Sequence, residues 1–174
     1  YMLNNPINGD EFEQEDERIL LGGSLSNEVE TEIFGIPVTR NIGTDMRYDN
    51  VSELNLFYTV GRKRINSLRE DEAEELSIGA FADLEFSLTD QLRATLGVRF
   101  DYYDFEVEAL RPGNSGNDND SLWQPKVSLA YSLNENFELY ANYGQGFHSN
   151  DARVAVNTID PVTGDPTASL DALV

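Results

Sequence analysis

Residues 76–100 read LSIGAFADLEFSLTDQLRATLGVRF, with an apolar side chain at every second position on both sides of the polar segment 89–91. This alternation predicts two β-strands, each with one apolar face and one polar face. Because the even parity continues across the polar segment, the two runs predict a hairpin whose apolar faces coincide. Soluble strands are usually about 5 or 6 residues long, whereas a tilted strand that crosses a bilayer needs roughly 9 to 11, and both runs reach that length.

The polar face of this hairpin carries charges of both signs. Pairing across the turn puts Asp83 diagonal to Arg99, and the same register puts Glu85 diagonal to Arg93. Carboxylates beside guanidinium groups indicate a charge-neutralising network rather than a pair of catalytic acids. With the matching positions of the later strands, the residues that we expect to face the lumen of a barrel are Asp83, Glu85, Arg93, Arg99, Lys126, Glu138 and Asn142.

The apolar face determines what the sheet packs against. On it we expect the lipid-facing residues to include Leu84, Leu96, Val98, Leu129 and Ala141. Aromatic residues gather at both ends of this face: Phe100, Tyr102, Trp123, Tyr143 and Phe147 at one end, and Phe86, Tyr131 and Phe137 at the other. Two aromatic bands are typical of the interfacial girdles of membrane barrels, whereas a soluble sandwich would have its aromatic residues mainly in the middle.

Alternation outside the central hairpin predicts four further strands. Their ranges are 18–25, 38–48, 122–133 and 137–147. In the last two, we expect Tyr131 beside Leu139 and Trp123 beside Phe147. The remaining segments are rich in acidic, Asn, Gly or Pro residues and predict loops; they are 1–17, 27–35, 49–75, 106–121 and 148–174.

The connections differ in length at the two ends of the predicted sheet. Segments 89–91 and 134–136 are short, while 49–75, 106–121 and 148–174 are long, and 49–75 is expected to extend as a hairpin beyond the sheet. Outer-membrane barrels have this asymmetry, with short periplasmic turns and long extracellular loops. The predicted fold is therefore all-β: an antiparallel transmembrane β-barrel segment of about six long strands, incomplete as a barrel.

The composition of the 174 residues excludes several functions. The chain has no cysteine and a single histidine, so it offers no disulfide, no thiolate metal site and no multi-histidine centre. We therefore expect no metal, no cofactor and no enzymatic activity. A formal net charge of −20 argues against nucleic acid as a partner. It leaves cationic ligands open, beside the simpler interpretation of solvated acidic loops. No apolar run approaches the roughly 18 residues of a transmembrane helix, so a membrane would have to be crossed by a barrel.

A polar cluster follows the last predicted strand. His148 continues the inner parity of that strand, and the candidates for the rim of the long loop are His148, Asn150, Asp151 and Arg153. These residues could contact an entering ligand. They could equally tie the base of the loop to its neighbours, for example through an ion pair from Asp151 to Arg153 or to Arg111.

Three motifs carry a resemblance to a known family. They are LGVRFDYYDF at 96–105, PKVSL at 125–129 and, above all, ELYANYGQGFHSNDAR at 138–153. Together they resemble the C-terminal barrel of TonB-dependent outer-membrane receptors. The resemblance extends over nearly the whole chain and is most specific in its last third.

This resemblance implies a function and a location. Such receptors close about 22 strands around an N-terminal plug domain in the bacterial outer membrane. They take up scarce ligands, such as ferric siderophores or cobalamin, and the TonB complex supplies the energy through the plug. We therefore expect residues 1–174 to be part of one receptor-like barrel domain, without the plug. The expected partners are outer-membrane lipid, the TonB complex and a small molecule or metal chelate.

Two other functions remain open at this stage. A passive porin would have the same alternating strands but would need no energy coupling. A soluble β-sheet binding module would pack its apolar face on a core rather than on lipid. A detergent requirement separates the soluble module from both barrels, and a plug domain separates the receptor from the porin.

Overall fold

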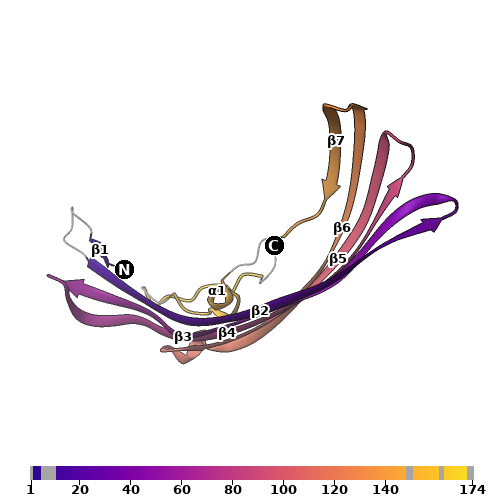
Figure 1. Cartoon of the computed structure of the whole chain (residues 1–174). Helices are drawn as coiled ribbons and strands as arrows, with labels where there is room; N and C mark the ends of the chain where they lie inside the picture. The colour runs from indigo at the N-terminus through magenta and orange to yellow at the C-terminus, as the bar shows by residue number, and fades with distance from the viewer. Residues whose placement is uncertain (1, 5–10, 148–150, 161–162, 172–174) are drawn as a thin grey trace.

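The computed structural model describes residues 2–4, 11–147, 151–160 and 163–171, and its main feature is one antiparallel sheet. Each strand pairs with the next one along the chain, in the order β1 to β7. Figure 1 shows that the sheet curves into an open trough, like part of a barrel wall. The elements are β1 (Met2–Asn4), β2 (Glu11–Ile33), β3 (Ile36–Val60), β4 (Lys63–Ser87), β5 (Leu92–Ala109), η1 (Pro112–Asn114), β6 (Gly116–Asn134), β7 (Phe137–Gly144) and α1 (Ala152–Val156).

The predicted fold class is confirmed. Six antiparallel strands of 8 to 25 residues form the open half-barrel, and the three-residue β1 pairs along part of β2. The central hairpin has the predicted register, with Leu84 opposite Leu96 and no shift along the whole β4 and β5 pairing. At its turn the hydroxyl of Thr89 accepts hydrogen bonds from the backbone N–H groups of Gln91 and Leu92, at 3.2 and 3.0 Å. A threonine at this position thereby satisfies donors that the tight turn would leave free.

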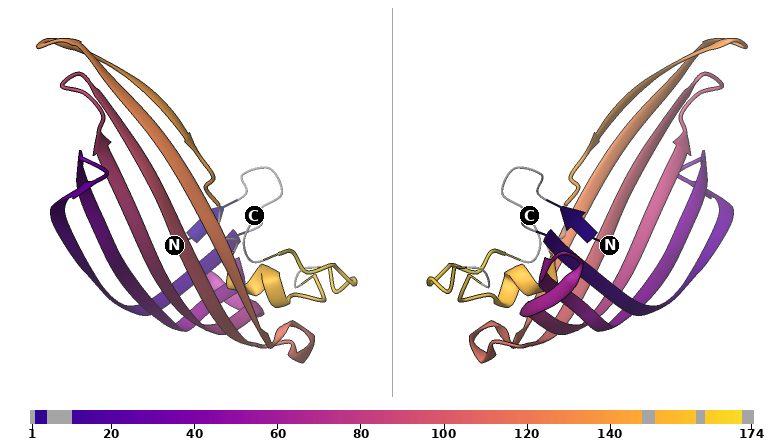
Figure 2. Two further views of the ribbon diagram at one scale, coloured as in Figure 1. Left: turned by 90° about the vertical axis from the view of Figure 1, so that its right-hand side faces the viewer. Right: turned by 90° about the vertical axis from the view of Figure 1, so that its left-hand side faces the viewer.

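The two faces of the sheet differ in chemistry. Helix α1 lies inside the trough, and it packs against Phe105 and Val107 of β5, so the odd positions of β4 and β5 face the concave side (Figure 2). The even positions of β4 and β5 face the convex side, and so do the odd positions of β6 and β7 that pair with them. The expected lipid-facing residues lie on this side. There Leu96 is 50% exposed and Leu129 is 45% exposed, with Leu139 of β7 at 58%. A large apolar surface is therefore uncovered on the convex face. In the part of the chain that the structure describes, no helix is long and apolar enough to cross a membrane.

The strands are longer than the sequence predicted. Segments 11–17, 27–33, 49–60, 63–75, 106–109 and 116–121 belong to strands rather than loops. Two tight turns make these extensions possible, because Phe34 and Gly35 have φ of 53° and 78°, and Gly61 and Arg62 have φ of 57° and 64°. Successive positive φ angles are the geometry of two-residue hairpin turns. The alternation fails in 11–17 and in 49–75 because the register shifts next to Arg18 and at three places between 51 and 59.

The last hairpin was predicted only in part. Tyr131 pairs with Leu139, as expected. The expected pair of Trp123 and Phe147 is wrong, because β7 ends at Gly144. The indole of Trp123 instead packs on Phe100 across the convex face, with ring centroids 4.8 Å apart. Phe147 belongs to no convex aromatic band, since its ring meets Tyr103 of the concave face at 5.6 Å.

The segment after β7 folds into the trough instead of forming an open loop (Figure 1). The methyl groups of Ala152 and Ala155 in α1 bury Phe105 and Val107, which are 0% and 2% exposed. The buried side chain of Asn114 also holds this segment, donating to the carbonyl of Ile159 at 2.8 Å and accepting from its N–H at 2.9 Å. A short polar segment thus covers the only sizeable cluster of buried apolar side chains among the described residues.

The open edges of the sheet predict how the chain behaves alone. In the described residues, β2 has a neighbour on its outer side only at Glu11–Glu13, and the outer side of β7 has none. Unpaired strand edges beside an exposed apolar face favour association. We expect the isolated 174-residue chain in detergent-free buffer to form polydisperse assemblies in size-exclusion chromatography with light scattering. A monodisperse monomer with cooperative thermal unfolding would contradict this expectation and support the soluble module.

Candidate functional site

A polar network across four strands dominates the concave face, and Arg99 of β5 lies at its centre. The guanidinium donates two parallel hydrogen bonds to Asp45 of β3, at 2.7 and 2.9 Å. Its Nε also donates to Asp101 at 2.8 Å. Gln124 of β6 donates to the same carboxylate at 2.5 Å. Asp101 is only 3% exposed, so these donors compensate the cost of burying its charge.

Two glycines on the same face make room for these long side chains. A Cβ atom on Gly79 would collide with the guanidinium of Arg99. A Cβ on Gly97 would collide with the carboxylate of Asp83 and lie 2.5 Å from Cε of Lys126. The charged groups can therefore lie flat across neighbouring strands. Glycine weakens a strand, so its presence here marks positions where side chains must approach the backbone closely.

A second set of ion pairs extends toward the short turns. Lys126 donates to Asp83 at 2.9 Å. Arg93 donates to Glu138 of β7 at 2.8 Å and lies 3.6 Å from the carboxylate of Glu85. These side chains are between one fifth and one half exposed, so each pair contributes little by itself. Together these pairs favour one register of strands β4 to β7, because the opposite charges meet only when the strands are aligned as observed.

The strand register places all of the residues predicted to face the lumen on the concave face. Asp83 contacts Lys126, however, and not Arg99 as its diagonal position suggested. Asn142 lies opposite Ser128 at the edge of the sheet, and its uncharged side chain takes no part in the ion pairs among the described residues. That the concave face lines a lumen stays a prediction. The sequence analysis missed three members of the Arg99 network, namely Asp45, Asp101 and Gln124.

A hollow of about 320 Å³ lies over the network. It is lined by Phe81, Asp83, Arg99, Gln124 and Lys126, among others. Each cation there already has a carboxylate partner, so the hollow offers both donors and acceptors but no strong field of one sign. Such a surface suits the hydrogen bonding of a polar molecule or polypeptide that moves along it.

The predicted rim cluster is seen only in part, because His148 and Asn150 lie outside the described residues. Asp151 caps α1, accepting from the backbone N–H of Arg153 at 3.0 Å and from its Nε at 2.8 Å. The Arg153 guanidinium holds the pKa of Asp151 below its ordinary value, against the opposing effect of burial. Arg153 also lies 4.0 Å from the buried Asp71 of β4. These contacts correspond to the anchoring alternative rather than to a free ligand-binding cluster.

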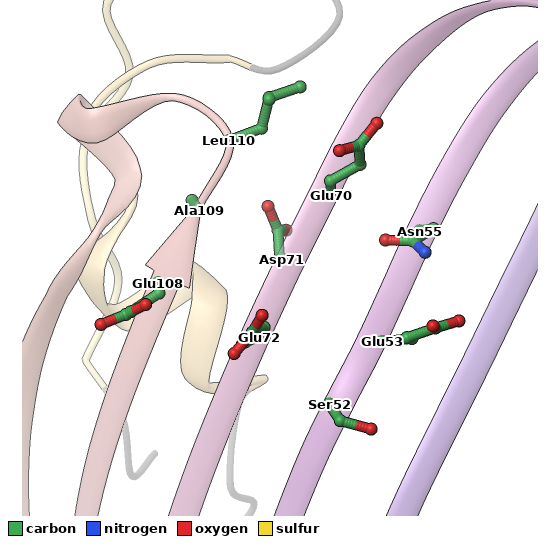
Figure 3. Close-up of a pocket in the computed structure, with 9 residues that line it drawn as sticks. All are labelled: Ser52, Glu53, Asn55, Glu70, Asp71, Glu72, Glu108, Ala109 and Leu110. Atoms are coloured by element: carbon green, nitrogen blue, oxygen red, sulfur yellow. The ribbon is translucent and has the colours of Figure 1, made fainter.

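A larger, acidic cavity of about 420 Å³ lies among the outer ends of β3, β4 and β5 (Figure 3). Its carboxylates include Glu53 of β3, Glu70 and Glu72 of β4, and Glu108 of β5, which Figure 3 shows spread over three neighbouring strands. Asp71 also lines it, but its carboxylate accepts from Arg69 at 2.9 Å. Among the described residues, no three acidic or histidine side chains converge in a way that could hold a metal ion. The cavity therefore provides acidic surface and no defined metal centre.

The Arg99 network gives a testable prediction for stability. Arg99→Ala leaves Gln124 as the one remaining side-chain donor to the buried Asp101. The substitution should lower the free energy of unfolding by about 2 to 3 kcal/mol. This is less than the loss expected for a fully buried pair, because Asp45 is partly exposed. Arg99→Lys keeps the charge but loses the bidentate fork, so it should cost less. The measurement is the urea midpoint of the complete barrel in detergent micelles, with Arg62→Ala at the exposed turn as the control. Equal midpoints for Arg99→Ala and the control would show that the network does not stabilise the barrel.

Comparison with known proteins gives the family. The family model described as "TonB dependent receptor-like, beta-barrel" matches residues 3–170. Among solved structures, the ferric yersiniabactin uptake receptor FyuA from Yersinia pestis aligns with a TM-score of 0.59 at 19% identity, over 96% of this chain and 25% of that one. The chain thus spans about a quarter of the length of that receptor, and at this identity the likeness shows the fold alone. Since the family model extends over nearly the whole chain, the protein belongs to the TonB-dependent receptor-like β-barrel family.

Proposed function

We propose that this chain is part of the wall of an outer-membrane receptor that takes up a scarce small molecule or metal chelate with energy supplied through TonB. The observation that carries the proposal is the division of the sheet into a convex apolar face and a concave polar face within this family. The convex face contacts lipid, and the concave face lines the lumen. TonB acts through a plug domain, as the resemblance of the sequence implies. The role of these residues is to bind and guide, and it requires no catalytic group.

The two aromatic bands support a position of the sheet in the membrane. Phe100 and Trp123 mark the outer band, and Tyr131 and Phe137 mark the inner one. Between them the convex face carries aliphatic residues, as in the lipid-facing belt of outer-membrane barrels. The strand extensions beyond the outer band, including the acidic segments 11–17 of β2 and 70–75 of β4, project into the extracellular medium. This position explains how a chain with a net charge of −20 can be part of a membrane protein.

The alternative function with the same fold is a passive porin, and energy coupling separates the two. The experiment uses cells that carry the complete receptor and follows accumulation of ⁵⁵Fe-loaded yersiniabactin and of radiolabelled cyanocobalamin. The first probe is chosen because FyuA is named for its uptake, and the second because the wider family suggests it. We expect the receptor to increase accumulation of one of these two probes, and a tonB deletion or a protonophore to abolish that increase.

The outcomes of this experiment separate the hypotheses. Receptor-dependent accumulation that persists without TonB would identify a porin and contradict the proposal. Accumulation of neither probe, with the receptor present at normal abundance in the outer membrane, would contradict the proposed class of ligand. The control is a receptor with Glu30→Gln, a change at an exposed position of β2 outside the polar network and the acidic cavity, which should leave uptake unchanged.

A further inference from the structure

A small cavity of about 170 Å³ lies between the concave wall and the start of α1. Strands β2, β3 and β4 provide one side of it, through Arg18, Arg47, Asp49 and Glu75, and Asp151 closes the other. Glu75 pairs with Phe105, beyond the outer aromatic band, so the cavity lies at the extracellular mouth of the concave face. We refer to it as the Asp49 pocket.

Asp49 is the unusual residue of this pocket. It is only 5% exposed, and one of its carboxylate oxygens, Oδ2, accepts from Nε of Arg47 at 2.6 Å. The other oxygen, Oδ1, is buried and has no hydrogen-bond partner among the described residues. A buried carboxylate oxygen without a donor carries an uncompensated desolvation cost. The pocket therefore contains a carboxylate oxygen that can accept a hydrogen bond from a group outside the described residues.

A second carboxyl group lies beside this acceptor. Glu75 is directly opposite Asp49 in the register of β3 and β4, and side chains at such positions are about 4.5 to 5.5 Å apart at their Cβ atoms. Among the described residues, no group donates a hydrogen bond to the carboxylate of Glu75. Burial, and to a lesser degree the charge of Asp49, raise the pKa of Glu75. Two acceptors thus lie together in a partly desolvated position.

The local charges do not balance. Around the pocket, each arginine has a carboxylate of its own: Arg18 contacts Asp16, Arg47 contacts Asp49, and Arg153 contacts Asp151. Glu75 has no such partner among the described residues. The pocket thus has an excess of one negative charge, and the unpaired oxygen of Asp49 lies next to it. One monovalent cation with at least two N–H donors would satisfy both groups.

We propose that the Asp49 pocket binds an ammonium or guanidinium group carried by the ligand of this receptor. The inference rests on the proposed function, since it assigns a cationic group to the molecule that enters along the concave face. The volume fits such a group, with no room for a large ligand as a whole. A divalent metal ion fits less well, because Arg47 already occupies one oxygen of Asp49 and no three-ligand group is present among the described residues.

The test uses small probes of matched shape on the complete receptor in detergent micelles. Saturation-transfer NMR measures binding of ethylguanidinium and propylammonium, with neutral propionamide and anionic propionate as comparison. We expect saturable binding of the two cations alone. Asp49→Asn and Glu75→Gln should each weaken it by about tenfold or more, while Glu30→Gln, at an exposed position of β2 outside the pocket, should have no effect.

Three results would overturn the inference. The first is equal binding of the neutral and cationic probes, and the second is cation binding that Asp49→Asn and Glu75→Gln both leave unchanged. The third is the lack of any probe binding, which would mean that Glu75 and Asp49 share a proton or that a group of the receptor itself fills the pocket. Retained heat-modifiable mobility in gels confirms that each variant is folded, and the two variants test the pocket independently. Since these measurements use neither uptake nor TonB, probe binding without energised uptake would reject the proposed function alone.

Discussion

The backbone hydrogen-bond ladder between β4 and β5 is the constraint on which the rest of the structure depends. It extends from Asp71 opposite Ala109 to Ser87 opposite Arg93 without a register shift. Because side chains alternate strictly along a strand, this ladder assigns every residue of both strands to one face. A slip by one residue would move Arg99 and Asp101 to the convex face and bring aliphatic residues into the polar network. The division of the sheet into an apolar face and a polar face is therefore a direct consequence of the strand register.

The charged network reinforces that register rather than supplying much stability. Its exposed pairs contribute little individually, and the buried Asp101 would be destabilising without its donors. What the network adds is specificity, because Arg99 reaches Asp45 only if β3, β4 and β5 are aligned as observed. Gly79 and Gly97 have the same effect, since any side chain there would displace the charged groups. A wall built in this way keeps its polar face flat and accessible.

Much of this architecture could be predicted from the sequence, and the failures have physical causes. The central hairpin alternated without a break and had a short polar turn, so both its strands and its register were predicted correctly. The hairpin expected at 49–75 is present in the extensions of β3 and β4, although its residues were assigned to a loop. The extension of β2 at 11–17 was missed, because a bulge near Arg18 breaks the alternation. The turn at Gly61 and Arg62 was not predicted, because it lies in a segment rich in charged residues, which is typical of a loop.

The candidate site was predicted less completely than the fold. Parity alone was enough to place Arg93, Arg99 and Lys126 on one face. It could not choose partners, because Arg99 reaches Asp45 on a strand that is not its direct neighbour, and Asp83 reaches Lys126 across β5. The inward path of residues 151–160 depends on Phe105, Val107 and Asn114, which are far away in sequence. Local sequence patterns do not predict such long-range contacts. For the same reason they do not predict the pocket beside Asp49.

The central claim is that one face of the sheet contacts lipid and the other contacts water. Its most direct test is to measure the accessibility of each residue along one strand to probes in the two phases. The chain has no cysteine, so single cysteines at 92–100 in the complete receptor can each carry a nitroxide label in lipid vesicles. Electron paramagnetic resonance then compares collision with oxygen, which concentrates in lipid, against collision with a water-soluble nickel chelate. We expect a period of two, with the even positions favouring oxygen and the odd positions favouring the chelate. Equal accessibility along the strand, or the opposite parity, would contradict the account.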